Sequence, residues 1–178
     1  VTCINELREK KVLAEDTKAD LDRENIPYDK NISVGVMIET PAASEIADLL
    51  AKEADFFSIG TNDLTQYTMA VDRGNSKVAY LYSVYNPAVI RSIKRIISAA
   101  ANENIIAGMC GEAAADPLLT PLLISFGLKE FSVNASSILR TRAQIAKWTK
   151  AEADKVADEV MKCATQEEVY EILKRYER

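Results

Sequence analysis

Short apolar runs alternate with longer amphipathic stretches along this chain of 178 residues. Four of the short runs are predicted to be β-strands because each is brief and apolar, and the first is rich in β-branched residues. They span residues 32–38, 56–59, 105–110 and 131–133. Apolar spacing and capping signals predict helices over residues 4–24, 40–50, 86–101 and 137–148, with further helices opening near residues 116 and 165.

Several of these helices begin with a sequence signal that starts helices. Thr40-Pro41, Asn86-Pro87 and Asp116-Pro117 each join a capping side chain to a first-turn proline. Thr165 is followed three residues later by Glu168, which predicts a capping box for the last helix. The signals separate the predicted strands by helices rather than by tight turns.

Alternating strands and helices predict an α/β fold with a parallel sheet. A doubly wound sheet and a (β/α)8 barrel both fit this rhythm. A barrel takes about 250 residues, so four strands would make roughly its C-terminal half. No glycine-rich dinucleotide fingerprint follows any strand, which counts against a Rossmann domain.

Composition narrows the classes of partner. The chain is 48% hydrophobic, enough for one sizeable core, and 22 basic against 27 acidic side chains leave a net charge of −5. No basic tail is present, so no nucleic-acid partner is expected. No apolar run approaches the roughly 20 residues of a membrane span, and no leader opens the sequence, so we expect a cytoplasmic protein with no membrane partner.

Cysteine and histidine content limits the chemistry. Cys3, Cys110 and Cys163 are widely spaced and form neither a metal-binding pair nor a disulfide framework. Histidine is absent, which excludes histidine triads and imidazole metal sites from these residues.

Polar side chains follow three successive predicted strands. Glu39 follows the first, Asn62 and Asp63 follow the second, and Cys110 and Glu112 end the third. Ligands and catalytic groups gather at the carboxyl edge of parallel sheets. These residues therefore predict a site at that edge.

Glu39 and Asp63 suit Mg²⁺, which takes one or two protein carboxylates and completes its shell with water and phosphate oxygens. Either acid alone could instead cap the following helix, but the pair beside Cys110 favours a site. Arg73, in the connection after the second strand, could clamp phosphate or carboxylate; by itself it is interpreted more simply as a solvated loop arginine. Cys110 by itself is typical of a small buried residue.

Four segments resemble phosphoenolpyruvate (PEP)-utilising enzymes, and especially the enzyme I family of the bacterial phosphotransferase system. They are VMIETP at 36–41, DFFSIGTNDLTQY at 55–67, AVDRGN at 70–75 and GMCGE at 108–112. The resemblance covers nearly the whole chain. Pyruvate phosphate dikinase and PEP synthase are the alternative relatives; the dikinases carry a histidine where this chain has Ala113-Ala114-Ala115.

The resemblance implies the C-terminal half of a (β/α)8 barrel across residues 1–178, ending in terminal helices over about 150–178. It implies that Glu39 and Asp63 bind Mg²⁺, that Asn62, Asp63 and Arg73 bind PEP, and that Cys110 protonates the enolate. A thiol that is protonated at neutral pH suits a general acid.

The implied reaction passes phosphate from PEP to a histidine on an N-terminal domain of the same parent chain, and then to the histidine-containing phosphocarrier protein. A homodimer is implied as well. The family's upstream phosphate-binding arginines and its phosphohistidine domain are absent here, and Ala115 replaces a usual glycine. We therefore expect little turnover from these residues alone, and a non-catalytic binding or dimerisation fragment is the alternative from another class.

Overall fold

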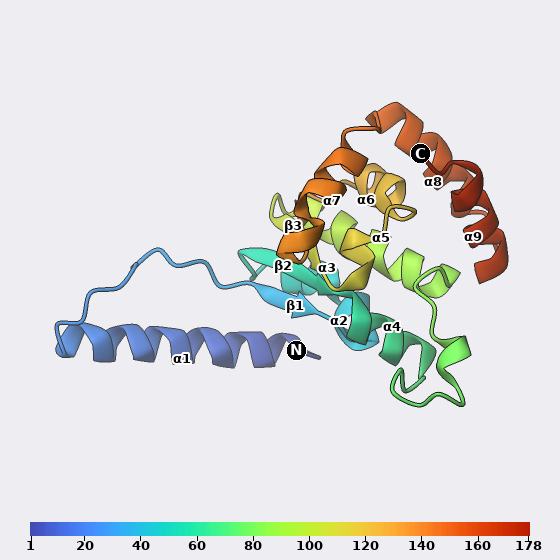
Figure 1. Ribbon diagram of the computed structural model, residues 1–178. Helices are drawn as coiled ribbons and strands as arrows, with labels where there is room; N and C mark the ends of the chain where they lie inside the picture. The colour runs from blue at the N-terminus through green and yellow to red at the C-terminus, as the bar shows by residue number, and fades with distance from the viewer.

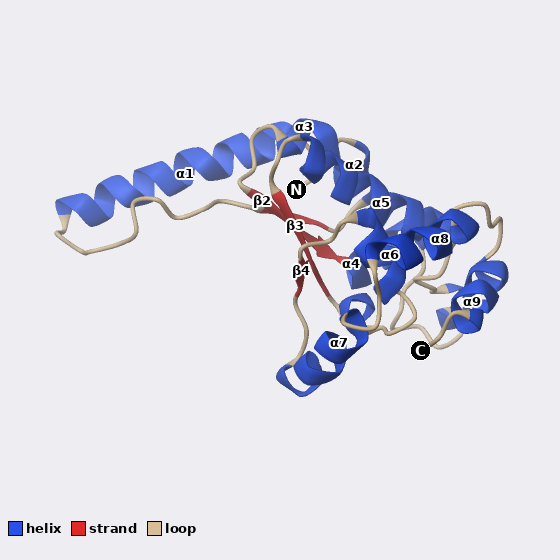
Figure 2. Cartoon of the chain, turned by 90° about the horizontal axis from the view of Figure 1, so that it is seen from above, coloured by secondary structure: helices blue, strands red, loops and turns tan.

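The computed structural model describes residues 1–178 and contains one four-stranded parallel sheet with helices packed on one face (Figure 1 and Figure 2). The strands are β1 (Val36–Ile38), β2 (Phe56–Gly60), β3 (Ile106–Cys110) and β4 (Glu130–Phe131). The helices are α1 (Ile4–Arg23), α2 (Pro41–Glu45), α3 (Ala47–Ala51), α4 (Thr61–Met69), α5 (Pro87–Asn102), α6 (Thr120–Phe126), α7 (Ile138–Ile145), α8 (Lys150–Val160) and α9 (Gln166–Arg175). Short 3₁₀ helices lie at Ala79–Leu81, Glu112–Ala115 and Ala135–Ser137.

Strand order decides between the two architectures that the sequence left open. The strands pair in chain order, β1-β2-β3-β4, and every pair is parallel. A doubly wound sheet reverses its strand order at a switch point, whereas a (β/α)8 barrel does not. The predicted α/β class is confirmed, and the topology is that expected for half of a (β/α)8 barrel.

The two faces of the sheet differ in burial. Side chains toward the helices are at most 3% exposed and form the core with α2, α3 and α5; they are Val36, Ile38, Phe57, Ile59, Ala107 and Met109. On the opposite face Met37, Phe56 and Ile106 are 40%, 39% and 54% exposed. Parallel sheets ordinarily bury both faces. This sheet therefore has one face that the described residues do not cover.

Local signals explain most helix starts. The Thr40 hydroxyl accepts a hydrogen bond from the Ala43 N–H, and Asn86 caps α5 in the same way, as predicted. The helix predicted over 40–50 is interrupted at Ile46, whose backbone leaves helical geometry. The prediction of a helix from Asp116 was wrong, because the Asp116 carboxylate accepts the Leu118 N–H in a turn and α6 begins only at Thr120.

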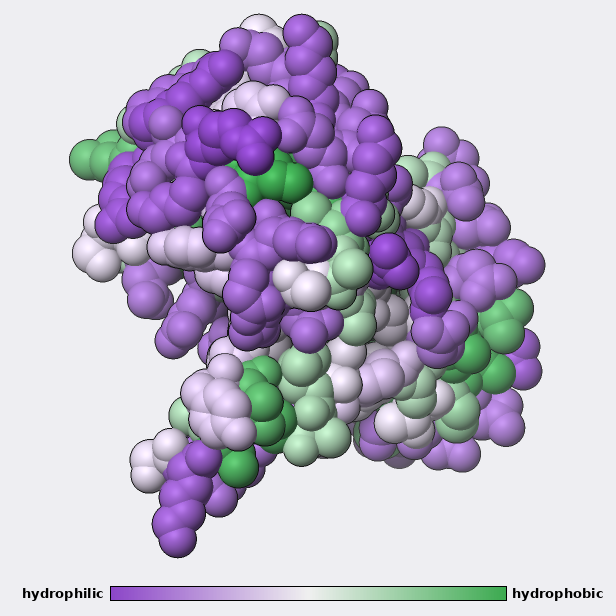
Figure 3. All heavy atoms as spheres, turned by 90° about the vertical axis from the view of Figure 1, so that its right-hand side faces the viewer, coloured by the Kyte–Doolittle hydropathy of each residue, from purple (hydrophilic) through white to green (hydrophobic).

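The two ends of the chain pack differently. Helix α1 extends away from the sheet (Figure 1), with Leu7 as its buried residue and an Arg8–Glu53 ion pair of 2.6 Å holding it to the segment after α3. Helix α8 packs on α6 and α9, and both terminal helices begin with complete capping boxes. The capping box predicted at Thr165 is confirmed. The outward surface of α8 and α9 is largely hydrophilic (Figure 3).

None of the helices combines the length and apolar character needed to cross a bilayer.

Candidate active site

The carboxyl ends of the strands bring the predicted residues to one edge of the sheet. Glu39 directly follows β1, and Cys110 is the last residue of β3. Asn62 and Asp63 lie in the first turn of α4, because this helix begins at Thr61 with no intervening loop. A helix at this point was not predicted, and it holds both side chains on a rigid element.

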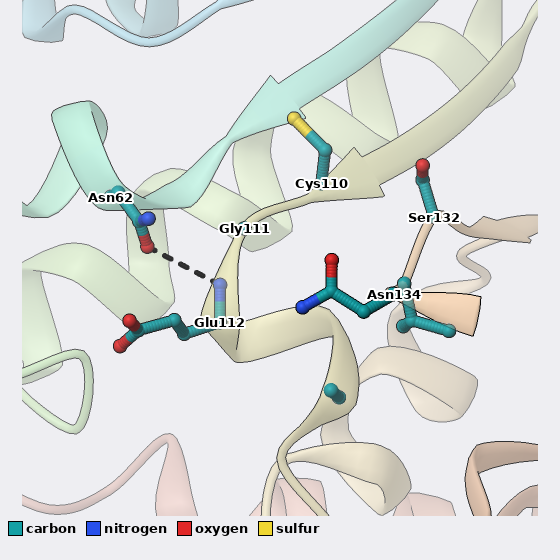
Figure 4. A pocket seen from close by; sticks show the side chains of 8 residues that line it. Asn62, Cys110, Gly111, Glu112, Ser132 and Asn134 are labelled. Atoms are coloured by element: carbon teal, nitrogen blue, oxygen red, sulfur yellow. Dashed lines mark hydrogen bonds between the residues drawn. The ribbon is translucent and has the colours of Figure 1, made fainter. Parts of the chain in front are cut away.

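A cavity of about 550 Å³ opens at this edge. Its lining joins three of the strand-end residues noted in the sequence, Asn62, Cys110 and Glu112, to a wall contributed by the segment after β4 (Figure 4). Ser132 and Asn134 from that segment line the cavity, and the Asn134 carboxamide points into it across from Asn62. Sequence reasoning missed both residues: it placed Ser132 inside the fourth predicted strand, and it gave no role to Asn134, which follows that strand as Glu39 follows the first.

Asn62 is oriented by the backbone of the neighbouring strand connection. Its Oδ1 accepts a hydrogen bond of 3.3 Å from the Glu112 N–H (Figure 4). The Tyr82 hydroxyl donates to the backbone carbonyl oxygen of Asn62 over 3.2 Å. With its oxygen engaged, the Asn62 amide keeps two N–H donors for a ligand.

Gly111 allows the strand end to approach α4. Its φ of 96° and ψ of −177° lie in a region that is essentially restricted to glycine. A Cβ at this position would come within 2.5 Å of Thr61 Oγ1 and 3.1 Å of Asn62 Oδ1. The Thr61 hydroxyl donates to the Cys110 carbonyl oxygen over 3.0 Å, which ties β3 to the start of α4.

The Cys110 thiol lies on the uncovered face of the sheet at the cavity. Sγ is 3.6 Å from the Ile59 carbonyl oxygen and 3.8 Å from Met37 Sδ. The Ser58 hydroxyl is a further contact, with Oγ 3.8 Å from Sγ. Cys110 is half-buried, so the thiol is held by protein on one side and open to the cavity on the other.

Glu39 and Asp63 lie at the same edge of the sheet, but they do not share a basic partner. A Cβ at Gly60 would lie 3.0 Å from Glu39 Oε2, so the glycine makes room for this carboxylate beside β2. Asp63 Oδ1 is 3.4 Å from Arg73 Nη2, with both side chains partly exposed, whereas Glu39 has no basic partner. No group of three or more Asp, Glu, His or Cys gathers as a metal site. Two oxygen donors of this kind match the protein share of a Mg²⁺ shell.

The connection that carries Arg73 is fixed at both ends. The backbone N–H of Arg73 donates to Gln66 Oε1 over 3.2 Å. At the far end, the Tyr85 hydroxyl donates to Asp116 over 2.5 Å, and its ring meets Tyr170 of α9 edge-on at 5.4 Å. Burial and the Asp116 carboxylate raise the pKa of Tyr85 above the ordinary phenol value. Among the predicted site residues, Asn62 and Cys110 line the same cavity, and Asp63 forms an ion pair with Arg73.

Comparison with known proteins assigns the chain to a family. The family described as PEP-utilising enzyme, PEP-binding domain, matches residues 1–150. The chain belongs to this family of PEP-binding domains. Relatives named phosphoenolpyruvate-protein phosphotransferase are similar over nearly the whole chain: 49% identity over 98% of it in Geobacillus stearothermophilus, 47% over 99% in Staphylococcus aureus and 48% over 99% in Enterococcus faecalis.

The chain spans about 30% of the length of these curated relatives (30%, 31% and 31%). The similarity to enzyme I that the sequence motifs indicated is confirmed. All three relatives carry the phosphotransferase name, which favours that relationship over the dikinases. The PEP-binding family and the site at the carboxyl edge of the sheet agree, because the cavity lies where this architecture places its ligands.

Proposed function

We propose that this chain supplies part of the PEP site of a phosphoenolpyruvate-protein phosphotransferase. The reaction moves a phosphoryl group from PEP to a histidine on an N-terminal domain of the same parent chain, and then to the histidine-containing phosphocarrier protein of the sugar phosphotransferase relay. The observation that carries the proposal is the cavity of about 550 Å³ that both Asn62 and Cys110 line. The names of the relatives support the substrate.

Glu39 and Asp63 are the proposed Mg²⁺ ligands. Bound there, the ion would offset negative charge on the phosphate oxygens. The free carboxylate of Glu39 supports this role. Asp63 lies 3.4 Å from Arg73, and on binding the ion its carboxylate would exchange this ion pair for the metal. Arg73 would then hold phosphate or carboxylate oxygens of PEP, and Asn62 would donate its remaining N–H groups to the phosphate.

Cys110 is the proposed general acid. When the bond between phosphorus and the enol oxygen breaks, the phosphoryl group passes to the acceptor histidine and the electron pair remains on the enolate. The enolate methylene carbon then takes the proton from Cys110 Sγ, which gives pyruvate and a thiolate. The opening of the thiol to the cavity supports this role.

The remaining partners lie outside these residues. No histidine is present in the sequence, so the phosphoryl acceptor belongs to another part of the parent protein. The uncovered face of the sheet supports the proposal that residues 1–178 are part of a larger barrel domain. A homodimer and a cytoplasmic location complete the proposal, and we expect little or no turnover from the 178 residues alone.

The proposal is tested first at Cys110. In the full-length protein, Cys110→Ser should lower PEP-dependent autophosphorylation by roughly 10²- to 10⁴-fold, the usual contribution of a general acid. Cys3→Ser is the matched control, because Cys3 is exposed at the N-cap of α1. Near wild-type rates in Cys110→Ser would remove the thiol from the mechanism.

The metal ligands are tested in the full-length protein, by calorimetric measurement of PEP binding at increasing Mg²⁺ concentrations. Glu39→Gln should raise the Mg²⁺ concentration needed for PEP binding at least about 10-fold, because a neutral amide is a weaker ligand for a hard cation. Glu45→Gln is the control, since Glu45 pairs with Arg95 on the outer helices. An equal Mg²⁺ requirement in both variants would exclude Glu39 as a ligand.

A further inference from the structure

A single hydroxyl group lies beside the Cys110 thiol on the uncovered face of the sheet. The parallel register pairs Ser58 of β2 with Met37 on one side and Gly108 on the other. Gly60, two residues on, pairs with Cys110, so Ser58 and Cys110 project from the same face as diagonal neighbours. Ser58 Oγ is 3.8 Å from Cys110 Sγ, within the range of a hydrogen bond to sulfur.

Ser58 has no competing polar partner. Its neighbours on this face include the apolar side chains of Met37, Phe56 and Ile106, and Gly108 contributes no side chain. The Glu39 and Glu130 side chains lie over Gly60 and Gly108 on the same face, and neither forms a hydrogen bond with Ser58. The thiol is the one group with which the Ser58 hydroxyl forms a side-chain hydrogen bond. A half-buried hydroxyl in such surroundings is held to the partner that it has.

The contacts of Cys110 differ in the protonation state that they favour. The Ile59 carbonyl oxygen and Met37 Sδ are acceptors, and they can receive only the S–H proton of the thiol form. The Ser58 hydroxyl can donate, so it alone of these three contacts stabilises a thiolate. Once Cys110 gives up its proton, the two acceptors no longer contribute and the Ser58 hydrogen bond strengthens.

We propose that Ser58 is a positioning residue for Cys110, whose hydroxyl orients Sγ toward the cavity and stabilises the thiolate that remains after proton transfer. The catalytic meaning of this contact rests on the proposed function, whereas the contact itself does not. In this proton transfer carbon gains the proton, sulfur keeps the electron pair, and Ser58 retains its own proton while donating the hydrogen bond.

Fixed charges around the thiol stay constant across the test. They are Glu39 after β1, Glu130 on β4, Glu112 after β3, and Asp63 with Arg73 at and beyond α4. The Ser58→Ala substitution leaves all of these groups in place. A difference between the wild-type and Ser58→Ala profiles therefore reports on the thiol and its hydrogen bond.

The experiment measures the pH profile of iodoacetamide alkylation at Cys110, resolved by peptide mass spectrometry in the complete 178-residue chain. Ser58→Ala should move the midpoint of the profile upward by about one pH unit, the shift that follows from losing one hydrogen bond to a charged group. Ser58→Thr keeps the hydroxyl and should restore the wild-type midpoint. Cys3, exposed in the same molecules, is the internal reference and should not change.

An unchanged or lowered midpoint in Ser58→Ala would overturn the proposal, as would a Ser58→Thr profile that follows Ser58→Ala. In the full-length protein, Ser58→Ala should lower kcat about 10-fold and leave the KM for PEP near the wild-type value. The activity of Cys110→Ser separates the two hypotheses. If that variant is fully active while the alkylation midpoint moves in Ser58→Ala, the catalytic role of Cys110 fails and the contact stands.

Discussion

Replacing Gly111 by alanine tests the connection between β3 and α4 directly. The backbone of Gly111 has φ 96° and ψ −177°, and an added Cβ would meet Thr61 Oγ1 at 2.5 Å. Thr61 is 1% exposed and donates to the Cys110 carbonyl oxygen, so moving its side chain breaks a buried hydrogen bond. The same Cβ would lie 3.1 Å from Asn62 Oδ1 and would displace the amide at the cavity.

The free energy of unfolding should fall by about 2–6 kcal/mol. A non-glycine residue in this backbone region costs about 1–3 kcal/mol. Loss of the hydrogen bond from buried Thr61 costs roughly a further 1–3 kcal/mol. Gly127→Ala is the matched control, because Gly127 also has a positive φ of 92° but no atom within 4 Å of an added Cβ. Its cost should be limited to about 1–2 kcal/mol of backbone strain.

Urea unfolding of both variants, followed by calorimetric titration with PEP and Mg²⁺, measures these differences. Gly111→Ala should lose more stability than Gly127→Ala and should bind PEP at least about 10-fold more weakly, since Asn62 is displaced. Gly127→Ala should bind PEP as the wild type does. Equal losses of stability in the two variants, or wild-type PEP binding by Gly111→Ala, would show that Gly111 does not hold Thr61 and Asn62 in place.

Two further predictions concern pH. Tyr85 has a raised pKa through burial and its bond to Asp116, so its stabilisation is complete below the ordinary value of 10.0 and is lost as the pH rises further. Tyr85→Phe should remove the latest phenol step from an absorbance titration at high pH; loss of an earlier step would contradict this. The Arg178 guanidinium and the Thr149 hydroxyl and N–H lower the pKa of Glu152 to about 2, so that contribution is present above 4.5 and is lost as the pH falls toward 2. Glu152→Gln should therefore lower the urea midpoint at pH 7, and the gap to wild type should close near pH 2; a constant gap would exclude the effect.

Local sequence patterns alone predicted the secondary structure well where a signal lies within a few residues. The capping pairs at Thr40-Pro41 and Asn86-Pro87 start helices because side chain and backbone donors are neighbours in the chain. The four strands were placed within a few residues, and the motif around Asn62 identified the family. Local signals failed where local polar contacts competed, as at Asp116, whose carboxylate forms a turn instead of a helix start.

The tertiary structure decided everything that depends on neighbours distant in the chain. Strand order separated the barrel-type topology from the doubly wound alternative, and strand register placed Ser58 beside Cys110, 52 residues away. The wall formed by Ser132 and Asn134 depends on β4 pairing next to β3. The sequence determined which chemical groups stand at the strand ends. Their distances depend on sheet pairing, because parallel strands are joined through helices and their contacts are never local.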